Sequence, residues 1–157
     1  MKPLRGEGGY YVETYRSREE IVRAALPTRY NSERNFGTAI LYLLTPESVS
    51  ALHRLKSDEI FHFYLGDPVT MLQLHPGGTS EIITLGHDVL SGQRVQVTVP
   101  TDTWQGCFLN EGGGFALMGT TVAPGFESAD FEAGRQDELL GQYPDQRDLI
   151  LKLTGKG

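Results

Sequence analysis

The sequence predicts an all-β domain with a short helical end, and three observations lead to this prediction. The chain has 157 residues, 19 of them glycine, a composition that favours strands joined by tight turns. Most of it consists of short runs of β-branched and aromatic residues separated by glycine, proline and aspartate. Only the stretch from residue 135 onward shows the apolar spacing of a helix. About eight to ten short strands at this spacing are typical of a sandwich or barrel.

The strands are expected at regular intervals along the chain. Their predicted ranges are 10–15, 38–45, 48–55, 59–65, 69–75, 79–85, 93–99, 103–109 and 115–122. Strands 48–55 and 59–65 are expected to pair around the turn at 56–58. The glycine run at 112–114 is expected to be a hairpin turn, because no lysine or helix follows it as in a phosphate-binding loop.

Three helices are predicted. Ser17 and Glu20 fit a capping box, which predicts a short helix over residues 18–25, ended by Pro27. Two amphipathic helices are predicted at 135–142 and 145–153.

Composition limits the classes of function. The length suits one domain, residues 1–157, and the net charge of −6 argues against a nucleic-acid partner. The longest apolar run, residues 39–44, is too short to cross a membrane. The N-terminus shows no signal-like segment, so a cytoplasmic location is expected. Cys107 is the single cysteine, which excludes an internal disulfide and a cysteine-rich zinc site.

The stretch from His53 to Gly66 is the strongest candidate for a site. Strand alternation places Glu59, Phe61 and Phe63 on one face and His62 on the other. A carboxylate that leads apolar side chains into an interior needs a charged or hydrogen-bonding partner. His53, on the other side of a short turn, is the obvious partner.

Several phrases of the sequence resemble one branch of the cupin superfamily. They are GGYYVETYRS, HRLKSDEIFHFYLG, VPTDTWQG and TVAPGFESADFE, in this order between Gly8 and about Leu153. The branch is catalogued mainly as a domain of unknown function and is also called cupin family five. The resemblance implies a double-stranded β-helix, the cupin jelly roll, with short C-terminal helices here. It also implies a homodimer and a ligand pocket inside the barrel, but no known reaction.

The departures from the general cupin pattern bear on metal binding. In cupin metal sites, two histidines and a glutamate of a first motif and a histidine of a second motif bind a divalent metal. Here His53 and Glu59 stand at matching positions, but Leu55 replaces the second histidine and Gln105 replaces the third. This donor set is poor for zinc or iron. We therefore expect no cofactor. A divalent metal is the minor alternative, with His53, Glu59 and Gln105 as weak candidate ligands.

His53 and Glu59 can also support chemistry without a metal. A buried histidine beside a carboxylate is suited to act as a general base. Metal-free sugar-nucleotide epimerases of the cupin superfamily use a barrel histidine as base and a tyrosine as acid. Tyr11, Tyr42 or Tyr64 could supply the acid here, and no spacing selects among them. The structural alternative is that His53 and Glu59 form a satisfied buried polar pair.

Further residues could contact a ligand or only support the fold. Gln105 is predicted to hydrogen-bond a ligand, and Phe61 and Phe63 to line or fill the barrel. Arg54 could meet a phosphate or carboxylate, against a default role as a solvated or interface charge. Trp104 is expected to pack between the sheets.

Three hypotheses of function follow. The first is binding of a small polar molecule, sugar-like or nucleotide-like, with metal-independent isomerisation or epimerisation in which His53 is the base and Glu59 orients it. The second is a metal-dependent oxygenase or isomerase that needs a further ligand. The third is a non-catalytic sensor or binding protein.

Overall fold

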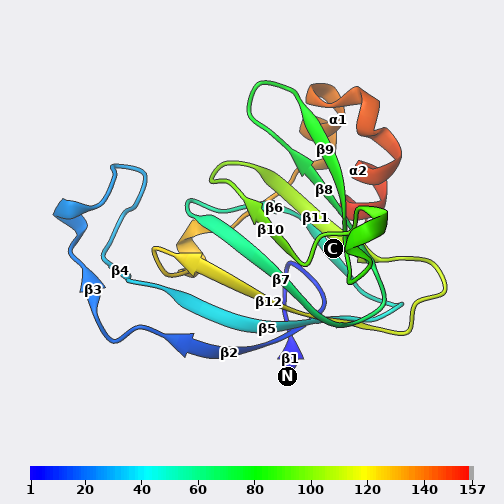
Figure 1. Ribbon diagram of the computed structural model, residues 1–157. Coiled ribbons are helices and arrows are strands. Elements are labelled where there is room, and N and C mark those ends of the chain that lie inside the picture. The colour runs from blue at the N-terminus through cyan, green and yellow to red at the C-terminus, as the bar shows by residue number, and fades with distance from the viewer. Residues whose placement is uncertain (156–157) are drawn as a thin grey trace.

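The computed structural model describes residues 1–155 and shows two antiparallel sheets that face each other across one core (Figure 1). In spatial order, the strands of the six-stranded sheet are β1 (Lys2–Pro3), β2 (Tyr10–Arg16), β5 (Thr38–Leu44), β12 (Ala116–Ala123), β7 (Asp58–Gly66) and β10 (Gln96–Val99). The strands of the five-stranded sheet are β13 (Glu132–Ala133), β6 (Val49–Arg54), β11 (Trp104–Leu109), β8 (Val69–Leu74) and β9 (Ser80–Leu85). The all-β prediction is confirmed, and the nine predicted strands match β2 and β5 to β12 within a few residues.

The chain crosses repeatedly from one sheet to the other, as a double-stranded β-helix requires. From β5 to β13 it changes sheet at each connection except between β8 and β9, which pair directly. Two predictions were wrong for this reason. The turn at 56–58 joins β6 to β7 in the opposite sheet, and residues 112–114 join β11 to β12 in the opposite sheet. Neither is a hairpin turn.

The predicted helix at residues 18–25 was also wrong. This segment contains β3 (Glu20–Ile21) and a short 3-10 turn, η1 (Arg23–Ala25). β3 pairs with β4 (Arg34–Asn35) in an arm that projects from the barrel (Figure 1). The Ser17 hydroxyl accepts from the Glu19 N–H at 3.2 Å. This bond closes a local turn, while pairing with β4 keeps the following residues extended.

The two C-terminal helices are confirmed as α1 (Gln136–Gln142) and α2 (Arg147–Thr154). They cover the five-stranded sheet from outside, where Leu52 and Leu72 pack against Leu139 and Ile150. Trp104 belongs to this outer cluster, so the expectation that it packs between the sheets was wrong. Within residues 1–155, no helix is long and apolar enough to cross a membrane.

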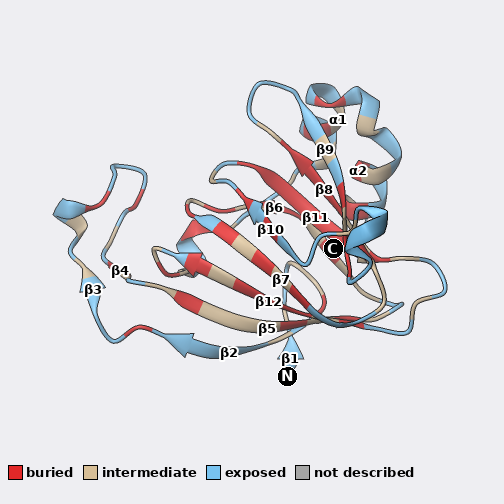
Figure 2. Ribbon diagram, in the orientation of Figure 1, coloured by how far each residue is buried: buried red, intermediate tan, exposed pale blue. Residues whose placement is uncertain are grey.

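Burial follows the layers (Figure 2). The central strands of both sheets carry most of the buried residues, whereas β1 and β2 at one edge are largely exposed. The core between the sheets contains Phe61, Phe63, Met71, Cys107 and Met118. The three remaining short elements are 3-10 turns at η2 (Val89–Ser91), η3 (Ser128–Asp130) and η4 (Pro144–Gln146).

Candidate functional site

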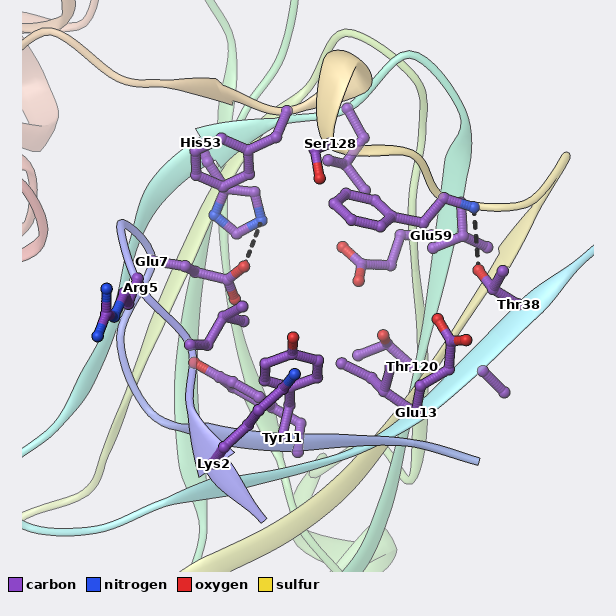
Figure 3. A pocket seen from close by; sticks show the side chains of 18 of the residues that line it. Lys2, Arg5, Glu7, Tyr11, Glu13, Thr38, His53, Glu59, Thr120 and Ser128 are labelled. Carbon is purple, nitrogen blue, oxygen red and sulfur yellow. Dashed lines mark hydrogen bonds and ion pairs between the residues drawn. The ribbon is translucent and has the colours of Figure 1, made fainter. Parts of the chain in front are cut away.

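A cavity of about 740 Å³ occupies one end of the barrel (Figure 3). Its walls come from both sheets, from the N-terminal segment and from the chain around η3. The polar side chains that line it include Glu7, Tyr11, His53, Glu59, Thr120 and Ser128. This volume is in the range of small-molecule sites.

His53 lies near the end of β6, with 2% of its surface exposed. Its Nδ1 atom is 2.8 Å from the Ala51 carbonyl oxygen, which can only accept, so Nδ1 carries the proton. Its Nε2 atom is 2.8 Å from the Gln105 amide nitrogen, which can only donate. Both nitrogens of the ring are therefore hydrogen-bonded in this arrangement. The Phe131 ring stacks on it at 5.0 Å between centroids.

Glu59 opens the buried part of β7 and points into the cavity (Figure 3). Its carboxylate accepts a hydrogen bond from the Gln105 amide at 3.1 Å. Burial raises the pKa of Glu59 to about 7; His53 lowers it and the nearby carboxylate of Glu7 raises it. A carboxyl group with this pKa can both give and accept a proton near neutral pH.

Gln105 bridges the two groups. It lies on β11, pairs in register with His53 of β6, and donates from its amide nitrogen to both His53 and Glu59. Its Oε1 atom is buried without a hydrogen-bond partner in the described structure. The side chain lies behind the cavity wall instead of on it, so this geometry supports a role in holding His53 and Glu59. The predicted contact with a ligand stays a prediction.

The other predicted ligand-binding residues lie elsewhere. Phe61 and Phe63 are part of the apolar core and do not line the cavity. Arg54 lies outside the barrel because it follows the inward-facing His53 on the same strand. Its guanidinium pairs with Glu132 at 2.8 Å and lies 4.4 Å from the centre of the Trp104 ring.

Several lining residues were missed by the sequence reasoning. Glu7 reaches the cavity from the N-terminal segment, and its Oε2 atom is 3.7 Å from His53 Nε2. Thr120 enters from β12, while Ser128 and Phe131 enter from the chain around η3. These residues are distant in sequence from residues 53–66. The one local signal was the glycine pair that follows Glu7.

The segment that carries Phe131 is fixed by a buried ion pair. Arg34, on β4 of the arm, donates to both carboxylate oxygens of Asp130 at 2.8 and 2.6 Å. The two side chains are 0% and 2% exposed. Their hydrogen bond raises the pKa of Arg34 further above its usual value. The arm thus holds η3, and with it Phe131, against the cavity.

Of the tyrosines named as possible acids, Tyr11 and Tyr42 line the cavity. The Tyr42 hydroxyl donates to the Gly8 carbonyl at 2.8 Å, and burial raises the pKa of this phenol well above 10. Tyr64 is 45% exposed and stacks on His62 outside the barrel. Tyr11 is therefore the tyrosine best placed to contact a ligand.

The donor set does not fit the metal site of the cupin pattern. Leu55 lines the cavity with an apolar side chain, and the Gln105 amide nitrogen occupies the space between His53 and Glu59. His62 hydrogen-bonds Thr121 on the opposite face of β7, so it cannot replace a missing histidine. Within residues 1–155, no three His, Cys, Asp or Glu side chains are grouped as a metal site.

A double-stranded β-helix with a polar cavity at one end, lined by a histidine and a glutamate, defines a cupin. The family described as "Cupin superfamily (DUF985)" matches residues 1–134. The chain belongs to this family, as its sequence motifs predicted.

Relatives agree with this assignment. An uncharacterized protein of Saccharomyces cerevisiae is 33% identical over an alignment of 144 residues, and the match covers 85% of this chain and 71% of the relative. A solved protein from Shewanella oneidensis is 36% identical with a TM-score of 0.81, over 94% of this chain and 87% of that one. A solved hypothetical protein from Leishmania major is 30% identical with a TM-score of 0.83, over 94% and 90% of the two chains.

Proposed function

We propose that this protein binds a small polyhydroxyl molecule, sugar-like in size and polarity, and moves a proton on it without a metal. The observation that carries the proposal is the His53–Gln105–Glu59 chain at the inner end of the cavity. It includes a carboxyl group with a pKa of about 7 that faces the cavity. Such a group is suited to isomerisation or epimerisation beside a carbonyl.

The charges of the cavity favour a neutral, hydroxyl-rich inner end of the ligand. Glu7 and Glu59 present hydrogen-bond acceptors there, which repel a phosphate or carboxylate. Arg16 lines the same cavity, but Glu13 and Glu127 already pair with its guanidinium at 2.9 and 3.0 Å. Lys2 lies over the Tyr11 ring at 5.2 Å. An anionic part of a ligand would therefore contact Lys2 rather than the inner end.

Glu59 is the group that exchanges the proton with the ligand in this proposal. Both nitrogens of His53 are already hydrogen-bonded, so His53 cannot accept a proton from the ligand in this arrangement. It is linked to Glu59 through Gln105 as long as the Gln105 amide keeps its present orientation. If the amide rotates to present Oε1, it accepts from a protonated His53 and from a protonated Glu59. This rotation would also release His53 Nε2 from the amide N–H, which is how His53 could serve as the base.

The test is deuterium exchange in chelator-treated protein. A panel of aldoses, ketoses and their phosphates is incubated in D₂O, and proton NMR follows loss of the C–H signal beside each carbonyl. Thermal unfolding is measured with the same panel. We expect one class of sugar to raise the melting temperature and to exchange. Glu59→Gln and His53→Ala should reduce that exchange by about a hundredfold or more, while Arg54→Ala should retain it. A panel with neither stabilisation nor exchange would contradict the proposal.

A non-catalytic binding role is the second candidate. The observation that favours it is that the lone pair of His53 Nε2 already accepts from Gln105, which leaves no free imidazole base in the present arrangement. Stabilisation by a sugar without deuterium exchange would select this role.

A further inference from the structure

The first nine residues form a wall of the cavity that is bonded to both sheets. β1 pairs with Tyr10–Tyr11 of the six-stranded sheet. The Glu7 carbonyl accepts from the Ala51 N–H of the five-stranded sheet at 2.8 Å. Between these points the chain turns back, and Gly8 N–H donates to the Leu4 carbonyl at 2.8 Å. The N-terminal segment therefore spans the open edge between the sheets.

Gly8 and Gly9 make this turn possible. Their φ angles are +104° and +69°, a region that residues with a side chain rarely adopt. A β-carbon on Gly9 would lie 2.6 Å from the Tyr42 hydroxyl oxygen, and one on Gly8 would collide with the Val49 carbonyl. The pair lets the segment pack closely on β5 and β6, and this packing aims the preceding residue, Glu7, into the barrel.

The Glu7 side chain is held in a defined position. It is 15% exposed, and its Oε1 atom accepts from the Ser50 hydroxyl at 2.9 Å. Its other oxygen, Oε2, is 3.7 Å from His53 Nε2 (Figure 3). Both backbone and side chain of Glu7 are thus fixed to β6, the strand that carries His53.

This position gives Glu7 a chemical task. When His53 takes a proton on Nε2, the new N–H needs an acceptor. The nitrogen of the Gln105 amide cannot accept, and Gln105 Oε1 can accept only after the amide rotates. Glu7 Oε2 is the carboxylate oxygen that lies ready for it. We infer that Glu7 is a positioning residue of the His53–Gln105–Glu59 chain, delivered to it by the N-terminal segment. The inference deepens the proposed function, since it assigns a further residue to the same site.

The other charged groups that face the cavity do not substitute for Glu7. Glu13 is paired with Arg16 at 2.9 Å, and Lys2 lies over Tyr11. Arg5 lines the cavity but is exposed. Glu7 is therefore the charged side chain with a defined contact to His53, besides the Glu59 that Gln105 links to it.

The test uses the full chain without ligand, so its result is independent of whether a sugar is bound or turned over. Two-bond proton–nitrogen NMR at a fixed pH of about 7 reports which nitrogen of each histidine carries a proton. We expect Glu7→Gln and Ser50→Ala to shift the Nε2 resonance of His53. The control Glu47→Gln, on an exposed turn, should not shift it. The other three histidines serve as internal references. An unchanged His53 spectrum in Glu7→Gln would overturn the inference.

Hydrogen exchange tests the wall itself. In the wild type, the Ala51 amide should be protected by its bond to Glu7. In Gly9→Ala it should exchange about tenfold faster or more, while the Met71 amide in the core stays protected. If the Ala51 amide of the wild type exchanges as fast as that of a frayed terminus, the N-terminal segment is not held against β6 and does not form a fixed wall of the cavity. Glu7→Gln and Ser50→Ala keep both glycines, so they decide the role of Glu7 even if Gly9→Ala does not fold.

Discussion

The two ends of the barrel interior use the same strands and the same alternation but differ in chemistry. On β7, Glu59 faces the cavity, and the next inward residue, Phe61, lies in the core. On β12, Thr120 faces the cavity, and Met118, two residues away, lies in the core. One end of the interior is therefore a polar hollow and the other a filled apolar core.

This difference shows how a strand pattern makes a site. Backbone pairing continues through both ends, so it does not decide where the cavity forms. Apolar side chains can fill space to crystal-like density. A buried carboxylate instead needs hydrogen bonds, and Glu59 takes its bond from Gln105. In this barrel the cavity forms where polar side chains point inward, and the apolar end is filled.

The largest expected effect is at the filled end. Phe61→Ala should lower the free energy of unfolding by about 3–5 kcal/mol, because it leaves a void in a close-packed core. Thr120→Val, which keeps the shape at the polar end, should cost only about 1 kcal/mol. Urea unfolding of both variants measures this contrast. Equal losses would contradict the division of the interior into two ends.

The next effect concerns pH. The pKa of Glu59 is raised from its usual 4.5 to about 7, so the folded protein holds this proton more tightly than the unfolded chain. The stability that Glu59 contributes is fully present below pH 4.5 and is lost as pH rises through 7. Glu59→Gln should abolish this loss and, above pH 7, be more stable than the wild type by about 3 kcal/mol. Urea unfolding from pH 4.5 to 8 measures it. A difference that does not change with pH would contradict the assignment.

A variant designed to bind a metal is an independent test of the polar end. Leu55→His with Gln105→His would restore the two histidines of the cupin pattern beside His53 and Glu59. We expect the double variant to bind zinc or manganese. A metal concentration 100 times its dissociation constant should stabilise it by about 2.7 kcal/mol. The matched comparison is the wild type under the same conditions, where we expect no such gain. Equal stabilisation of the wild type would show that His53 and Glu59 suffice with other donors.

The smallest effect is expected outside the barrel. Arg54→Ala removes a half-exposed ion pair with Glu132 and a contact to Trp104. Such pairs contribute about 0–1 kcal/mol, so thermal unfolding should change by a few degrees at most. The affinity for any cavity ligand should stay the same. A large loss of affinity would show that Arg54 contributes to ligand binding after all.

Local patterns predicted most of the strands and the directions of their side chains. Alternation placed Glu59, Phe61 and Phe63 inside and His62 outside, as observed. Strand pairing was not predictable in the same way, because the short turns at 56–58 and 112–114 look like hairpins but join opposite sheets. Local propensity also failed at residues 18–25, where pairing with β4 overrides the capping signal.

The candidate site was predictable only in part. The motif identified His53 and Glu59, and both line the cavity. The bridging position of Gln105 depends on the pairing of β11 with β6 across 52 residues. The contact of Glu7 with the site depends on a turn of the N-terminal segment that packs on β6, more than 40 residues further along the chain. Apart from the glycine pair that follows Glu7, no local pattern points to these contacts.

One measurement tests the polar end most directly. Carbon-13 NMR of the side-chain carboxyl groups can follow the titration of Glu59 in the ligand-free protein, with Glu59→Gln to assign the signal. We expect a midpoint near 7, set by burial between His53, Gln105 and Glu7. A midpoint near the usual 4.5 would contradict a buried proton-exchanging group and, with it, the proposed chemistry of the cavity.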